Sequence, residues 1–131
     1  MCIRDRHVQA GGFLFINNCS GYQAFDRHSR RLVGRLFPDQ KLAVLPKEHA
    51  LYRAFHTITT GRDRQSTESR PLELEGVEVQ NRQGKARLAL VYSKNDMITH
   101  LKQVSDPFGN GYDADTCRKL AVNLVAYALQ N

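Results

Sequence analysis

Residues 11–18, Gly-Gly-Phe-Leu-Phe-Ile-Asn-Asn, decide the fold of this chain. A glycine pair leads into four consecutive apolar residues, two asparagines follow, and a helical pattern then runs from Tyr22 to Phe37. An apolar run without alternation is typical of a strand buried on both faces, as in a parallel sheet covered by helices. In such sheets, ligands bind beyond the carboxyl ends of the strands. The residues that end the run and follow it are therefore candidates for a functional site: Asn17, Asn18, Cys19 and Ser20.

The middle of the chain predicts a hairpin. Residues 72–79 alternate between apolar and acidic or polar side chains, which indicates a strand with one solvated face. Residues 87–93, Arg-Leu-Ala-Leu-Val-Tyr-Ser, form a more apolar run, and a glycine-containing turn separates the two. Before them, residues 57–71 are polar and predict a loop.

Two helices are predicted with clear ends. The first follows the apolar run, and Pro38 ends it because the residue before a proline avoids the helical region. Its arginines cluster among the remaining positions and predict a solvated face, or a contact with an acidic partner. The last helix begins at Asp113 or Asp115 and ends near Leu129. It is nearly apolar on all sides, which predicts a buried helix.

The order strand, helix, loop, hairpin, helix predicts an α/β three-layer sandwich with a mainly parallel sheet. A further strand and most of a helix are expected upstream, because otherwise one side of the sheet would be an unprotected edge. Residues 1–6, Met-Cys-Ile-Arg-Asp-Arg, resemble a translated sequencing adapter, and residues 7–10 predict the end of a helix closed by Gly11. We therefore expect an N-terminally truncated domain over residues 7–131, preceded by an artefact.

Composition excludes several classes of protein. The 131 residues, 41% hydrophobic and 24% charged, are typical of an ordinary globular domain. No apolar stretch approaches the ~20 residues that span a bilayer. The net charge of +6 comes from scattered basic residues without interleaved aromatics, which argues against nucleic acid as a partner. Cys19 and Cys117 lie far apart and the histidines occur singly, so we expect no metal and no cofactor.

Several blocks in this order resemble a bacterial family known as domain of unknown function 4159. They are GGFLFINN at residues 11–18, Phe25-Asp26-Arg27 through Phe37-Pro38, Leu45-Pro46 with His49 and Leu51, residues 74–79, LALVYSKND at residues 88–96 and AVNLVAYAL at residues 121–129. The resemblance implies a relative of class I glutamine-amidotransferase-like, flavodoxin-like domains. It also implies a larger protein that is exported, periplasmic or membrane-associated. Where Asn17 and Asn18 stand, the family commonly has acidic residues.

Polar residues that follow two strands suggest a binding site. Asn95 and Asp96 follow the second strand of the hairpin, just as Asn17 and Asn18 follow the first strand of the chain. If these strands are parallel neighbours, both loops open on one edge of the sheet, and His49 enters from a loop. Amides, a carboxylate and a histidine bind hydroxyl-rich ligands or orient a water molecule. The alternative is that the asparagines and the aspartate cap turns and helix ends.

Cys19 is the candidate nucleophile. Amidotransferase-like folds expose a cysteine in a Gly-x-Cys-x-Gly elbow, and here residues 17–21 read Asn-Asn-Cys-Ser-Gly, with the second glycine only. A histidine such as His49 or His28 is also required. We therefore expect a non-catalytic ligand-binding or interaction domain of a larger exported protein. Its partner would be a small, carbohydrate-like molecule or another domain of the same protein. The alternative is a hydrolase or transferase that uses Cys19, or Asp96 with His49.

Overall fold

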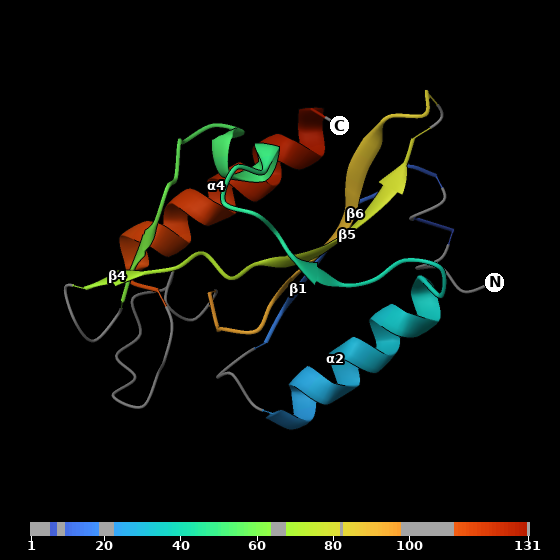
Figure 1. Cartoon of the computed structure of the whole chain (residues 1–131), viewed down its shortest axis with the longest axis horizontal. Coiled ribbons are helices and arrows are strands. Elements are labelled where there is room, and N and C mark those ends of the chain that lie inside the picture. Colours follow the sequence, from blue (N-terminus) through green and yellow to red (C-terminus); the bar gives the residue numbers. More distant parts are fainter. Residues whose placement is uncertain are drawn as a thin grey trace.

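The computed structural model describes residues 6–7, 10–18, 23–63, 68–81, 83–97 and 112–130. Along the chain, its named elements are β1 (Leu14–Asn17), α2 (Gln23–Leu36), β2 (Ala43–Val44), the 3-10 helix η2 (Ala50–Arg53), β3 (Gly61–Arg62), β4 (Ser69–Arg70), β5 (Glu75–Gln80), β6 (Ala86–Ser93) and α4 (Ala114–Gln130). The protein is thus a mixed α/β domain (Figure 1).

The main sheet has four strands in the order β1-β6-β5-β2. β1 runs parallel to β6, whereas β6 with β5 and β5 with β2 are antiparallel. The prediction of a mainly parallel sheet is therefore not confirmed for the described strands. The physical reason is the short connection between β5 and β6, which forces them to run in opposite directions. In that turn Gly84 has φ +76°, and the Asn81 side-chain oxygen accepts hydrogen bonds from the backbone N–H groups of Gln83 and Lys85.

Helices cover both faces of this sheet, as expected for three layers. α2 and α4 lie on opposite sides of the strands in Figure 1. On one face, Val33 of α2 and Phe37 just after it pack with Leu90 and Tyr92 of β6. On the other face, α4 and η2 pack with Leu88 and neighbouring core residues. β6 is consequently buried along almost its whole length.

An irregularity in β6 allows it to serve both layers. Val77 pairs with Leu90, but the next residue of β5, Glu78, pairs with Leu88, which leaves Ala89 as one extra residue on β6. Leu88 and Leu90 therefore belong to opposite cores instead of sharing one face. The prediction of one solvated face on β5 holds only for its second half, where Glu78 and Gln80 are exposed, whereas Glu75, which the alternation placed on the solvated face, is buried.

The structure also tests the predictions for α4 and for the loop over residues 57–71. α4 begins after Asp113, whose carboxylate accepts a hydrogen bond from the Thr116 backbone N–H at 2.8 Å, as expected of an N-cap. The predicted burial of α4 is only partly correct, because Val125 and Leu129 are 60% and 84% exposed. The predicted polar loop over residues 57–71 contains the two short strands β3 and β4, which pair antiparallel.

Candidate functional site

Two strand ends meet at one edge of the sheet. Asn17, the last residue of β1, pairs in register with Ser93, the last residue of β6, and both strands point the same way. The Asn18 backbone N–H donates to the Ser93 carbonyl at 3.0 Å and extends the ladder by one residue. β5 runs the other way, so its first residue, Glu75, lies at this same edge. We call this end of the sheet, with Asn17, Asn18, Ser93 and Glu75, the strand-end edge.

Asn17 and Asp96 are in direct contact on this edge. The Asn17 side-chain N–H donates to Asp96 Oδ1 at 3.1 Å, and the Asn17 side-chain oxygen accepts from the Met97 backbone N–H at 2.8 Å. One amide thus uses both its donor and its acceptor on the loop after β6. Asp96 is only 4% exposed, so this contact holds a buried carboxylate at the junction of the two loops.

Asn18 points to the opposite face and reaches a different group. Its side-chain N–H lies 3.4 Å from the Tyr92 hydroxyl, and that hydroxyl donates to Asp26 Oδ1 of α2 at 2.5 Å. Burial raises the pKa of Tyr92, and the hydrogen bond to Asp26 raises it further, so the phenol keeps its proton at neutral pH. Partial burial also raises the pKa of Asp26, but the contacts with Tyr92 and Arg30 outweigh it and leave that pKa below its usual value.

Arg30 completes this group. Its guanidinium donates to both oxygens of Glu75 at 2.9 Å each and to Asp26 Oδ2 at 3.0 Å. It also lies 5.6 Å from the centre of the Tyr92 ring. The hydrogen bonds to Glu75 and Asp26 raise the pKa of Arg30. The sequence predicted that Arg30 lies on a solvated face. The four-residue spacing of Asp26 and Arg30 on a helix could have indicated their ion pair.

A second, more exposed group surrounds Glu73. The Asn95 side-chain N–H donates to Glu73 Oε2 at 3.1 Å, and the Lys94 ammonium lies 3.8 Å from the same oxygen. The Ser93 hydroxyl donates to the Asn95 carbonyl at 2.6 Å, which fixes the loop. Lys94 is 47% exposed in its side chain, so this group faces solvent. The sequence did not identify Glu73 as a site residue, because it belongs to an alternating run that predicts a strand with one solvated face.

His49 lies elsewhere. Its Nδ1 accepts from the Leu51 backbone N–H at 3.1 Å and caps η2, so the ring proton belongs to Nε2, which lies 2.9 Å from Glu78 Oε1. Glu78 pairs with Leu88, five residues before Ser93 on β6. At ~3.3 Å per residue, about 16 Å of strand separates this position from the strand-end edge. The structure therefore unites Asn17, Asn18, Asn95 and Asp96 at one edge and leaves His49 outside it.

Cys19, the candidate nucleophile, lies outside the described residues, as does Ser20. In the part of the chain that the structure describes, no three His, Cys, Asp or Glu residues gather closely enough to hold a metal ion. The carboxylates of Asp26 and Glu75 are both bound to Arg30. A cation would have to compete with that guanidinium.

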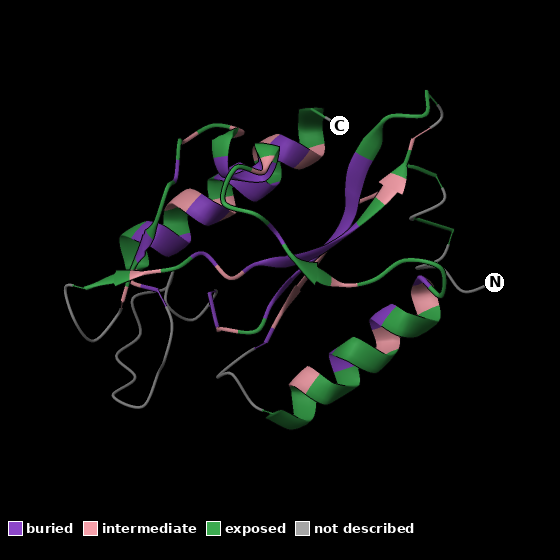
Figure 2. Cartoon of the chain, viewed as in Figure 1, coloured by how far each residue is buried: buried purple, intermediate pink, exposed green. Residues whose placement is uncertain are grey.

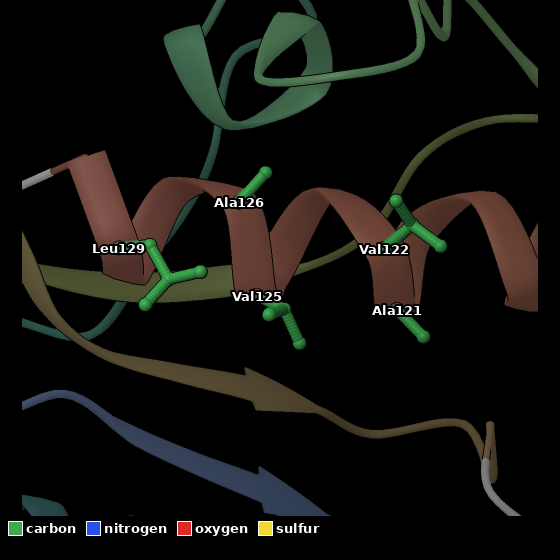
Figure 3. A pocket seen from close by; sticks show the side chains of 5 residues that line it. All are labelled: Ala121, Val122, Val125, Ala126 and Leu129. Atoms are coloured by element: carbon green, nitrogen blue, oxygen red, sulfur yellow. The ribbon is translucent and has the colours of Figure 1, made fainter.

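The outer face of α4 carries an apolar groove of about 420 Å³. Figure 3 shows the five residues that line it, which are spread along the C-terminal half of the helix: Ala121, Val122, Val125, Ala126 and Leu129. Among the described helices, none is long and apolar enough to cross a membrane. The described residues of the domain leave this groove uncovered.

These features define a mixed α/β domain with helices on both faces of its sheet and a polar edge where β1 and β6 end. The chain belongs to a family described as a domain of unknown function (DUF4159), whose model matches residues 4–129. No curated protein matches the sequence.

Proposed function

We propose that this domain is a non-catalytic ligand-binding or interaction domain of a larger exported protein, and that its ligand binds at the strand-end edge. The observation that carries the proposal is the group formed by Glu73, Lys94 and Asn95, in which a carboxylate, an ammonium and an amide lie side by side. Together they offer donors and acceptors to a hydroxyl-rich, carbohydrate-like molecule.

The loops behind this group support binding because they are held before any ligand arrives. The contacts of Asn17 with Asp96 and Met97 and of Ser93 with Asn95 tie the loop after β6 to β1 and to itself. Because these side chains are already held in place, a ligand that binds here has few of them to order, which reduces the entropic cost of binding.

The partners of the carboxylates support a non-catalytic role. Covalent catalysis needs a nucleophile and a base within hydrogen-bond reach. Here Asp26 accepts from a phenol and a guanidinium. Because the pKa of Tyr92 is raised, its phenol acts as a hydrogen-bond donor and not as a base.

The larger protein and the relation to amidotransferase-like domains rest on two further observations. α4 is apolar on its outer side, and a helix that is apolar all round is typically buried, which supports packing against another domain of the same protein. The parallel pairing of β1 with β6 between two helical layers supports the amidotransferase-like relation. Export follows only from the family resemblance.

Isotope-labelled protein titrated with maltotriose and with chitotriose tests the ligand site by nuclear magnetic resonance. We expect amide shift changes at residues 73 and 93–96, and their loss in a Lys94→Gln, Asn95→Ala double variant. The matched control is Lys85→Gln, which removes the same charge from the turn at the other end of β5 and β6 and should leave the shifts unchanged.

Two results would overturn the proposal. One is that neither sugar, nor their hydroxyl-rich relatives in a wider panel, shifts these amides at millimolar concentration. The other is turnover of a glycoside or an ester above the buffer rate that disappears in Asp96→Asn, which would make the edge an active site.

A further inference from the structure

The outer face of α2 carries three arginines whose charges nothing in the described chain balances. Arg27, Arg31 and Arg35 follow one another at four-residue spacing, and all three are exposed. Figure 2 shows most of α2 as exposed; its buried residues are Ser29 and Val33, and Val33 packs against β6. Residues four apart lie on the same side of a helix, so these arginines form one row. They are called the arginine row below.

No carboxylate among the described residues forms an ion pair with the arginine row. The only acidic residue of α2, Asp26, is already bound to Arg30 and Tyr92. Like charges four residues apart on a helix repel each other and lower its stability. The row therefore contains two like-charge pairs at four-residue spacing, Arg27 with Arg31 and Arg31 with Arg35, that no described ion pair offsets.

Gly34 provides a second, independent observation on this side of the helix. It lies in the helix interior, three residues after Arg31, and a Cβ added there would meet nothing within 4 Å. Packing within the described chain therefore does not require a glycine, although glycine in a helix interior is destabilising relative to alanine. A glycine in open space permits close approach of another backbone.

We propose that the arginine row and Gly34 form a docking surface for an acidic helical segment of a partner protein. Four residues of helix rise ~6 Å, so carboxylates at four-residue spacing on the partner match the row from Arg27 to Arg35. The planar guanidinium suits bidentate contact with a carboxylate. Gly34 lets the backbone of the partner helix come close between the charges.

This partner fits the surface better than nucleic acid does. Surfaces that bind single-stranded nucleic acid commonly place aromatic rings among their basic residues. The one exposed aromatic residue of α2, Phe25, lies two positions before Arg27 and therefore on a different side of the helix. The surface lies outside the strand-end edge, so this inference stands independently of the proposed ligand site.

Fluorescence anisotropy with the whole chain tests the proposal. The probe is a labelled, alanine-rich helical peptide with glutamate at every fourth position, and its control peptide has glutamine there. We expect the glutamate peptide to bind and salt to weaken it. The triple variant Arg27→Gln, Arg31→Gln, Arg35→Gln should lose about tenfold in affinity, since exposed ion pairs are individually modest.

Two further variants separate this surface from general charge. Lys47→Gln, Arg53→Gln, Lys85→Gln removes three positive charges from exposed positions elsewhere and should leave the affinity unchanged. Gly34→Leu retains every arginine, fits open space in the free domain and should weaken the peptide by blocking close approach. Circular dichroism confirms folding of each variant.

Three outcomes overturn the proposal. The first is equal binding of the glutamate and glutamine peptides. The second is an equal loss of affinity in the control triple variant. The third is preferential binding of duplex DNA or of phosphatidylserine vesicles that depends on the arginine row, which would assign the surface to a nucleic acid or a membrane.

Discussion

Arg30 on α2 donates two parallel hydrogen bonds, both 2.9 Å long, to the buried carboxylate of Glu75 on β5. The two residues are 45 positions apart in the sequence. Glu75 is 7% exposed, and it also stands in register with Tyr92 of β6. This pair, together with the hydrogen bond from Tyr92 to Asp26, is therefore a polar connection between the α2 layer and the sheet, beside the apolar contacts of Val33 and Phe37.

Arg30→Ala should lower the free energy of unfolding by about 2 kcal/mol, because it leaves the buried Glu75 carboxylate without its partner. The loss stays below that of a fully buried pair because the Arg30 side chain is 41% exposed. Urea unfolding measures it. Arg31→Ala, on the same helix and without an ion pair, should change the same free energy by less than about 0.5 kcal/mol. Equal losses would show that the ion pair adds nothing.

Asp26 should contribute to stability above its unfolded pKa of 3.8 and lose that contribution in acid. Its folded pKa lies below the unfolded value, so the unfolded state takes up a proton first as the pH falls. Stability should therefore decline from just above pH 3.8 downward through the folded pKa. Unfolding free energies measured along this range should flatten in Asp26→Asn. A wild-type slope in Asp26→Asn contradicts the prediction.

Asn123 of α4 should be among the most sensitive polar positions. Its side-chain N–H groups donate to the carbonyls of Leu51 and His56 at 3.0 and 2.9 Å, and its oxygen accepts from the His56 backbone N–H at 2.8 Å. Asn123→Ala leaves one buried and two partly buried backbone groups without this partner, so we expect a loss of about 2 kcal/mol in thermal or urea unfolding. Asn123→Asp keeps the size but removes both donors and should also destabilise. Val122→Ala, one residue earlier and partly exposed, should cost much less.

Two glycines should respond to alanine with opposite signs. A Cβ at Gly76 would lie 2.8 Å from Leu88 Cδ2 and 3.2 Å from the Leu90 carbonyl oxygen, so Gly76→Ala should destabilise by about 1–3 kcal/mol. Gly34→Ala meets nothing and should stabilise by about 0.5–1 kcal/mol. Melting temperatures of the two variants measure the contrast. A stabilised Gly76→Ala would show that the core beside β5 yields easily.

Much of the local structure could be predicted because it depends on short-range periodicity. The apolar run at residues 13–16 forms β1 from Leu14, the helical pattern forms α2, and the hairpin forms β5 and β6. Asp113 caps α4 through Thr116 as its residue type indicates. The meeting of Asn17 with Asp96 at one edge also follows from two parallel strand ends.

Other features could not be predicted because they depend on which distant elements meet. The acidic residues of the run at residues 72–79 indicate a solvated face, yet Glu75 is buried and bound by Arg30. The sequence predicted that His49 reaches the strand ends from a loop, but its Nδ1 caps η2 and its Nε2 contacts Glu78. The apolar outer side of α4 predicts burial, but Val125 and Leu129 on that side are exposed.

The sequence by itself determined where β1, α2, β6 and α4 form, and that polar residues follow β1 and β6. Those properties follow from side-chain periodicity, caps and turn residues within a few positions of each other. Only the tertiary structure decided that β2 pairs antiparallel with β5, that Arg30, unlike Arg27, Arg31 and Arg35, is bound to Glu75, and that His49 lies away from the edge. Each of these depends on contacts between residues far apart in the chain, whose free energies no local pattern encodes.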